Sequence, residues 1–389
     1  MTSTLSTSLS ARRIYGSPAQ IITVACAGLA AMLSIVSYTV LPERFLLDNS
    51  HIAEAIVSPL AAEETPSFRN IAAIYRSLGF AEQPALAALV SLVLFTVAVF
   101  AATRWSRLAQ FGVIGLAVVG ISFVLAVAYL AQYSKEVLTL VIVLVLLVMP
   151  RKPYADAILA LLMVGYGLFL RPYWVIIAGM YLVWRILLPR LKNPLLVIGA
   201  VAVGYALLEI AFRTVLSVGL TSNRAEINAS RVDDDVASLI VDPLPTDGAL
   251  AAVNATALLL MLLVPVTLVV TGNLFHVVSA VVIAFLWLTA IVGYIRLRRE
   301  GNATTLAGRP DFAGAPNGTA PNDTASNGAY PPGAPATIRA ARAAALLFAV
   351  VFVQAIFEPD FGSYLKHLTP LLPLFLTLVP LKSRSESKP

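Results

Sequence analysis

Charged residues are scarce in this chain. Only 12% of its 389 residues are Asp, Glu, Lys or Arg, whereas 59% are hydrophobic and the mean hydropathy is +0.84. Soluble domains carry about 25% charged residues. The composition therefore excludes a soluble multidomain protein and predicts a polytopic membrane protein.

Cysteine and histidine are nearly absent. The single cysteine, Cys26, lies inside the first hydrophobic run, so neither a disulfide framework nor a cysteine-based metal site is available. With three histidines, we expect no metal site and no cofactor. The sequence has no Walker or Rossmann glycine motif, no HExxH and no GxSxG. ATP-driven transport, zinc proteolysis and serine hydrolysis by those routes are poorly supported.

Long hydrophobic runs dominate the chain. A helix needs about 20 residues to cross the ~30 Å hydrocarbon core, and several runs are shorter, which favours helices that end in a water-filled cavity. We predict an all-α transmembrane bundle of 10–12 spans with short or broken helices around an outer-face cavity. The runs are 19–41, 84–102, 111–132, 137–149, 155–170, 173–188, 194–216, 249–270, 276–297, 341–357 and 368–381.

Basic residues gather at the ends of these runs, so we interpret the net charge of +6 as a topology signal rather than as a sign of nucleic-acid binding. The run 19–41 is too long for a cleavable signal and is expected to be the first span. Four basic pairs fall on alternate connections, which we assign to the cytoplasm: Arg12 and Arg13, Arg104 and Arg107, Arg151 and Lys152, and Arg190 and Lys192.

The C-terminal third conflicts with this scheme. Arg296, Arg298 and Arg299 look cytoplasmic, yet two full spans between residues 249 and 297 would place them outside. Either one run is re-entrant or a boundary is wrong. The predicted domains are a membrane domain, 1–300, with outer loops 42–83 and 217–248; a flexible Gly/Pro/Ala-rich linker, 301–338; and a C-terminal hairpin and tail, 339–389.

Lys135 and Glu136 lie side by side between two hydrophobic runs. Adjacent helical residues point about 100° apart, so they cannot pair with each other, and each needs its own partner. Lys135 suits a phosphate oxygen, and Glu136 suits a sugar hydroxyl or an arginine. The alternative is an ordinary outer turn whose charges reach water.

Three other segments predicted on the outer side carry site candidates. Arg171 precedes Pro172, which favours a helix start and hence an anion site, although an interfacial arginine would look the same. Arg224 and Arg231 are seven residues apart and would share one helix face, either as a diphosphate site or on lipid headgroups. The first loop contributes Asp48 and Arg69.

The final cluster contains Asp360, Lys366 and His367, followed by a proline-broken run. A histidine beside a lysine at the mouth of a span is a candidate base, and a helix-capping histidine is the alternative. His276, within an apolar run, is expected to be a packed interior residue.

The order of four short motifs resembles that of the Wzy-type O-antigen and exopolysaccharide polymerases, which are integral-membrane enzymes similar to GT-C glycosyltransferases. The motifs are Ser134-Lys135-Glu136, Arg171-Pro172-Tyr173, a long loop with spaced arginines, and Glu358 to Pro370. The short motifs extend over 48–373. The family pattern has arginine before the late histidine, where this chain has Lys366, which lacks the bidentate fork of arginine.

The resemblance implies an enzyme of the bacterial plasma membrane that joins lipid-linked oligosaccharide repeats at the outer face, with polyprenyl diphosphate as the leaving group. The expected partners are this lipid-linked substrate, the bilayer and other polysaccharide-assembly proteins. His367, Glu136 and Asp48 are the candidate bases. Substrate binding falls to Lys135, Arg171, Arg224, Arg231, Asp360, Lys366 and Arg69.

A competing interpretation is a transporter or flippase for a lipid-linked sugar or another anionic solute, in which the same charges line a translocation path. No internal repeat is visible in the sequence, which weakens this interpretation without excluding it. A third is a membrane scaffold without catalysis.

Overall fold

The structure is a computed structural model that describes residues 16–58, 66–152, 154–229, 238–244, 246, 250–307 and 334–381. In this part of the chain the regular elements are helices, and one isolated bridge joins Leu239 to Asp360. Five helices, which include segments 18–37, 84–103, 194–216, 274–299 and 338–357, are long and apolar enough to cross a membrane, and five more apolar helices are shorter. The protein is an all-α helical membrane protein.

Helices form wherever the sequence has a long apolar run. The N-terminal half contains α1 (Pro18–Val40), α4 (Pro84–Thr103), α6 (Val113–Tyr129), α7 (Glu136–Val148), α8 (Tyr154–Phe169), α9 (Tyr173–Leu187) and α10 (Pro194–Ala211). Proline begins three of them, because its fixed φ suits the first helical turn and its missing N–H is not needed there. Ser17 and Asn193 also cap α1 and α10 through their side chains.

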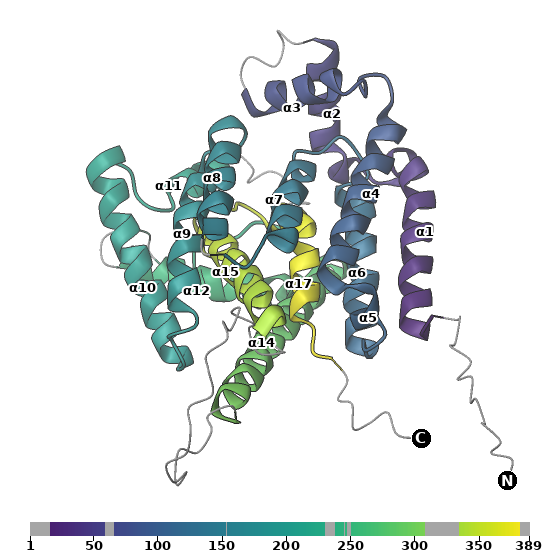
Figure 1. The fold of residues 1–389 in the computed structure, drawn as a ribbon. Coiled ribbons are helices and arrows are strands. Elements are labelled where there is room, and N and C mark those ends of the chain that lie inside the picture. The colour runs from purple at the N-terminus through teal and green to yellow at the C-terminus, as the bar shows by residue number, and fades with distance from the viewer. Residues whose placement is uncertain are drawn as a thin grey trace, which may run out of the picture.

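Shorter elements connect these helices. They are η1 (Glu43–Phe45), α2 (Leu47–Val57), α3 (Pro66–Ser77), α5 (Trp105–Leu108), the π-helical turn η2 (Phe212–Leu216) and α11 (Ser222–Ala229). Helices α2 and α3 pack on each other above the bundle, at the end of the molecule opposite to the start of α1 (Figure 1). We call α2 and α3 the cap.

The C-terminal third forms the centre of the molecule. It contains α12 (Leu250–Leu263), α13 (Val266–Val270), α14 (Leu274–Ala307), α15 (Ala334–Phe357), α16 (Phe361–Leu368), η3 (Thr369–Leu371) and α17 (Leu372–Leu378). Helix α15 packs against α9, α12 and α17, and α17 is buried along its whole length. A helix that is apolar on every side belongs in such a core.

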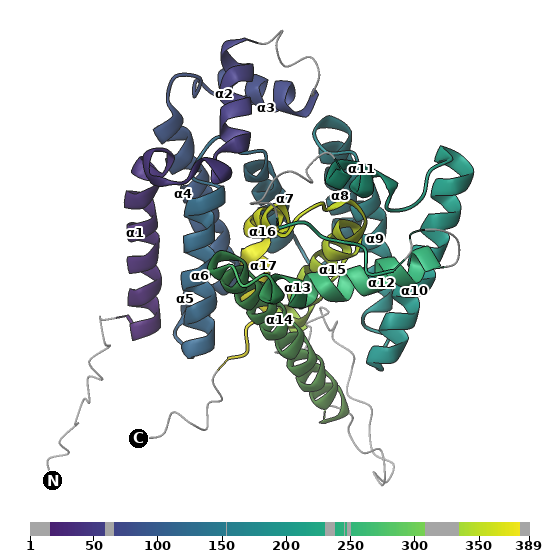
Figure 2. The ribbon, with the colours of Figure 1, turned by 180° about the vertical axis from the view of Figure 1, so that it is seen from behind.

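The run 249–270, at which the predicted sidedness breaks down, forms two helices instead of one continuous span. Pro265 separates α12 from α13, and the 14 residues of α12 make a helix about 21 Å long. Figure 2 shows α12 and α13 crossing the middle of the molecule before α14 descends. Arg298 consequently reaches the connection after α9, where it donates to the carbonyl oxygens of Pro189 and Leu191, 3.0 Å from each.

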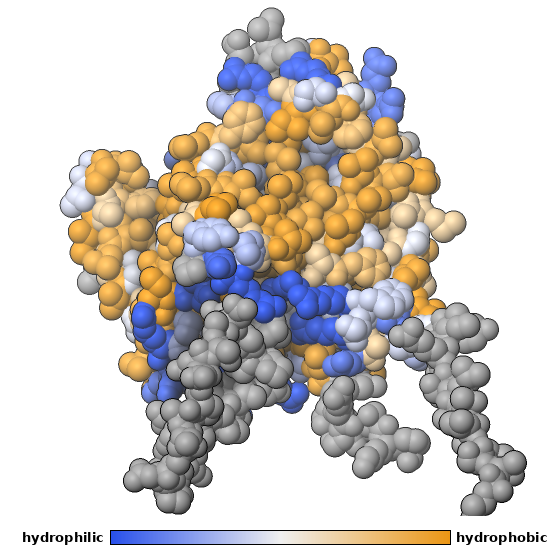
Figure 3. Space-filling view, viewed as in Figure 1, coloured by the Kyte–Doolittle hydropathy of each residue, from blue (hydrophilic) through white to orange (hydrophobic). Residues whose placement is uncertain are grey.

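Polar residues occupy the two ends of the molecule, with an apolar belt between them (Figure 3). One end is the cap. At the other end Arg107 donates to the Thr377 carbonyl, Arg339 to the Ala101 carbonyl and Arg342 to the Pro150 carbonyl, so the basic residues bind backbone groups at helix ends. The predicted linker falls largely on residues 308–333, outside the described residues, whereas α14 continues to Ala307 and α15 begins at Ala334.

Candidate functional site

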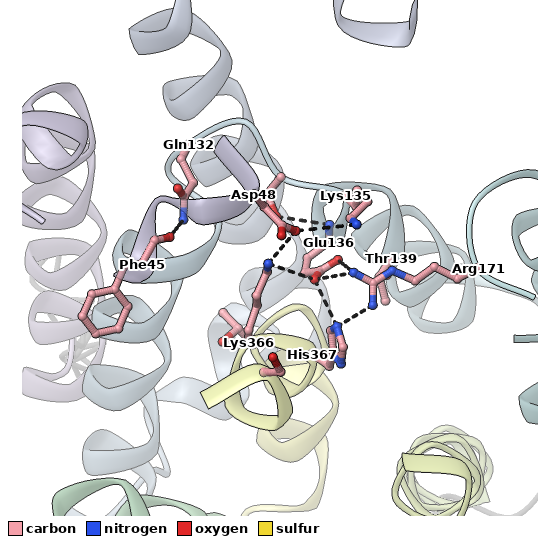
Figure 4. Close-up of polar contacts among 12 residues, drawn as sticks. Phe45, Asp48, Gln132, Lys135, Glu136, Thr139, Arg171, Lys366 and His367 are labelled. Atoms are coloured by element: carbon pink, nitrogen blue, oxygen red, sulfur yellow. Dashed lines mark hydrogen bonds and ion pairs between the residues drawn. The ribbon is translucent and has the colours of Figure 1, made fainter. Parts of the chain in front are cut away.

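Seven ionisable side chains from five segments meet where the cap joins the bundle, and Figure 4 shows the part of this group around Glu136. We call them the charge cluster. Helix α2 contributes one residue, the start of α7 two, the turn before α9 one, the end of α15 one and α16 two. The members are Asp48, Lys135, Glu136, Arg171, Glu358, Lys366 and His367.

The turn that carries Lys135 and Glu136 is fixed to the cap by hydrogen bonds. Gln132 donates to the Phe45 carbonyl at 2.9 Å, and the Tyr133 backbone N–H donates to Asn49 Oδ1 at 3.1 Å. The side chains of Lys135 and Glu136 are buried, with exposed fractions of 9% and 1%. They are therefore not the water-exposed charges of an ordinary turn.

Lys135 and Glu136 have separate partners, as their adjacency predicts. Lys135 Nζ lies 3.9 Å from Asp48 Oδ2 and 3.6 Å from the centre of the Phe68 ring. Glu136 accepts two hydrogen bonds from Arg171 Nη2, at 2.7 and 2.8 Å. Arginine is thus the partner of Glu136 in this structure, one of the two partners expected from the sequence.

Arg171 links the acidic and histidine parts of the cluster. Its Nη1 donates to the Tyr173 hydroxyl at 2.6 Å and to His367 Nε2. A guanidinium has no acceptor, so His367 Nε2 must accept, and the proton of the neutral ring is on Nδ1. That Nδ1–H donates to Glu358 Oε2 at 2.6 Å. Glu358 therefore fixes both the tautomer and the orientation of His367.

Asp48 bridges the two lysines of the cluster. Its Oδ2 lies 2.5 Å from Lys366 Nζ, in addition to the contact with Lys135. Burial raises the pKa of Asp48, but the positive charges of Lys366 and Lys135 outweigh it and hold that pKa well below its usual range. Asp48 stays ionised and joins the cap to α7 and α16.

Charges in the cluster balance. Three carboxylates face one arginine and two lysines, so the neutral form of His367 leaves the cluster with no net charge. A buried set of charges is tolerated in a membrane protein when its members pair with one another. A small cavity of about 10 Å³ adjoins the cluster between Glu136, Thr139, Gln354 and His367, with room for about one water molecule.

Three residues predicted to bind substrate, Arg224, Asp360 and Arg69, lie outside the charge cluster. Arg224 is fully buried, donates to the Ala355 carbonyl at 2.7 Å and pairs with Asp242, so it fastens α11 to α15. Asp360 caps α16 by accepting from the Ser363 backbone N–H at 2.8 Å. Arg69 is exposed on α3. Arg231 lies outside the described residues.

Two residues that contact the site candidates, Glu358 and Tyr173, were not assigned a role from the sequence. Glu358 follows a long apolar run and lies nine residues before His367. A carboxylate at the end of a predicted helix, close in sequence to the candidate base, was the feature of the sequence that could have identified it. Tyr173 follows Arg171 by two residues, and its contact with the guanidinium had no signal beyond that proximity. His276 is buried at the start of α14, as expected.

Comparisons of the chain with protein-family models, with curated proteins and with solved structures find no match. The geometry of the charge cluster is therefore the basis for any assignment of function.

Proposed function

We propose that this chain is a membrane glycosyltransferase that polymerises lipid-linked oligosaccharide repeats, as the Wzy-type enzymes it resembles do. The observation that carries the proposal is the charge cluster. It places a histidine oriented by a carboxylate beside an arginine and two lysines, at the end of an apolar bundle opposite to the basic end. A base and fixed cations are what transfer from a diphosphate-linked sugar requires.

In the proposed reaction a sugar hydroxyl of one repeat attacks the anomeric carbon of another. A new C–O bond forms as the bond from that carbon to the diphosphate oxygen breaks, and polyprenyl diphosphate leaves with the electron pair. His367 Nε2 takes the hydroxyl proton, and Glu358 stabilises the imidazolium through Nδ1. For this step the hydrogen bond from Arg171 Nη1 to His367 Nε2 must break, and the arriving diphosphate would accept the Nη1 hydrogen bond instead.

The lysines would hold the diphosphate. Asp48 occupies the place between Lys135 and Lys366 that a phosphate oxygen would take. Phosphate carries more negative charge than a carboxylate and is a common lysine ligand, so we propose that the donor displaces Asp48 and opens the cap. This opening would create the substrate cavity that the closed cluster lacks. Glu136 would remain with Arg171 and hold it in place.

We assign the cap to the outer face of a bacterial plasma membrane, because the basic end follows the positive-inside rule. The short helices α6, α7, α8 and α9 would then cross the membrane with the five longer ones. The expected partners are the bilayer, the lipid-linked oligosaccharide and other polysaccharide-assembly proteins.

The alternative is a transporter or flippase. The observation that favours this alternative is the closed, charge-balanced cluster, because paired charges of this kind also suit a gate in a translocation path. A transporter moves its substrate unchanged, whereas a polymerase consumes single repeats, so the products separate the two functions.

A complementation experiment tests the proposal. In cells deleted for this gene, Arg171→Lys and Lys366→Gln should leave lipid-linked single repeats unpolymerised, because lysine cannot replace the arginine contacts to Glu136 and Tyr173, and glutamine removes a phosphate partner. Arg69→Gln, on the exposed face of α3, is the matched control and should restore polymer. Normal polymer from both cluster variants, at normal protein levels, would disprove the assignment.

A further inference from the structure

An apolar groove of about 320 Å³ lies at the opposite end from the charge cluster. Its walls are α10 and α14, α15 forms its back and α12 crosses over it, an arrangement visible in Figure 2. Ile198, Leu260 and Ile291 line it and are each more than 40% exposed, so the groove opens sideways toward the surrounding lipid.

The length of the groove corresponds to one leaflet. Along α14 it extends from Trp287 to Arg298. Eleven residues of helix are about 16 Å long, roughly half of the ~30 Å hydrocarbon core. Helix α12, which crosses the molecule beside α10 and α14 in Figure 2, lines the groove through Thr256, Leu259, Leu260 and Leu263. One acyl chain fits this depth, whereas a long polyprenyl chain would extend beyond it.

Positive charge marks the open end of the groove. Lys192 and Arg298 line that end, and Arg298 lies 5.9 Å from the centre of the Tyr294 ring. Within the described parts of the chain, neither cation pairs with a carboxylate: Arg298 binds two backbone carbonyl oxygens, and Lys192 is exposed. Two uncompensated cations at the mouth of an apolar groove complement a lipid phosphate.

We propose that this groove binds an anionic glycerophospholipid, with one acyl chain between α10 and α14 and the headgroup phosphate on Lys192 and Arg298. By the positive-inside rule the lipid belongs to the cytoplasmic leaflet. The apolar walls would retain the chain, and the two cations would select an anionic headgroup over a zwitterionic one. This site is separate from the charge cluster and does not depend on the proposed glycosyl transfer.

Native mass spectrometry of the purified full-length protein tests the site with phosphatidylglycerol and phosphatidylcholine of identical acyl chains. The protein should retain phosphatidylglycerol preferentially. Lys192→Gln should reduce this preference roughly fivefold, the usual effect of one cation near a lipid surface. Lys152→Gln, an exposed lysine that does not line the groove, is the control and should keep the preference.

A second pair of variants tests whether an acyl chain occupies the groove, and neither substitution changes the charge of the protein. Val197→Trp fills the groove from α10 and should abolish retention of both lipids, whereas Val203→Trp, on the same helix and 60% exposed outside the groove, should not. Equal retention of both lipids by the unaltered protein, unchanged retention by Val197→Trp, or displacement of phosphatidylglycerol by polyprenyl phosphate would each overturn the proposal.

Discussion

The charge of Lys135 depends on its surroundings within the charge cluster. The residue precedes α7 and lies outside the spanning helices. Burial lowers the pKa of Lys135 to about 8, and the positive charges of Arg171 and Lys366 act in the same direction, against Asp48 and Glu136. In the proposed mechanism this lysine must be charged to hold a diphosphate.

The activity should therefore fall as the pH rises through about 8, because Lys135 loses its proton there. Lys135→Arg should remain active to higher pH, since arginine does not deprotonate in this range. The measurement is the pH profile of polymer formation by isolated membranes. Identical profiles for the two proteins would show that Lys135 does not bind the leaving group.

The lowered pKa of Lys135 also makes the free energy of unfolding depend on pH. The folded-state pKa of Lys135 is lower than its unfolded value of 10.5, so the charged lysine costs folding free energy below pH 8. This cost disappears as the pH rises from about 8 to 10.5, where the unfolded chain binds the proton and the folded chain does not.

At the residue scale, the sequence predicted the pairing pattern of some charges and not of others. The separate partners of Lys135 and Glu136 follow from helix geometry alone, and the structure confirms them. For Arg224, the spacing of residues along the chain does not predict which groups surround the side chain. Its distance from Arg231 predicts a shared face, but whether that face meets solvent depends on α15, which is more than a hundred residues further along the chain.

Among the elements, α11 is attached to the bundle by a buried ion pair. Arg224 is fully buried and pairs with Asp242, which also accepts a hydrogen bond from Asn254 at 2.6 Å. Removing one partner of such a pair typically costs 3–5 kcal/mol, because the other charge is left buried and unpaired.

Asp242→Leu should therefore lower the free energy of unfolding by about 3–5 kcal/mol. Arg224→Met with Asp242→Leu should lower it by clearly less than the sum of the two single changes, since no unpaired charge remains. Denaturation of the purified protein in detergent measures this coupling. Additive effects would contradict the structural role of Arg224 and return it to the substrate-binding candidates.

Element positions were predictable because each depends on a local apolar run. Nine of the eleven predicted runs each overlap one α-helix of the structure, as for 84–102 and α4, whereas 249–270 divides into α12 and α13 and 368–381 contains η3 and α17. The path of 249–270 was not predictable. Pro265 was visible in the sequence, but a proline can kink a spanning helix or end it, and packing against α10 and α15 decides which occurs.

For the whole molecule, the separation of the cap from the basic end predicts its orientation in the membrane. Glu82, just before α4 on the cap side, and Arg299, near the end of α14, are both exposed. With Cys26→Ala as background, an impermeant maleimide should label Glu82→Cys in intact cells. Arg299→Cys should be labelled only after permeabilisation. Labelling of Arg299→Cys in intact cells would reverse the orientation.

We propose that the charge cluster catalyses glycosyl transfer. The most direct measurement is the release of polyprenyl diphosphate in proteoliposomes that contain the purified protein and the lipid-linked single repeats extracted from deleted cells. We predict one diphosphate released for each new glycosidic bond, and a rate 10²- to 10⁴-fold lower for His367→Gln, the usual contribution of a general base. Movement of intact lipid-linked repeats across the bilayer without any diphosphate release would contradict the account.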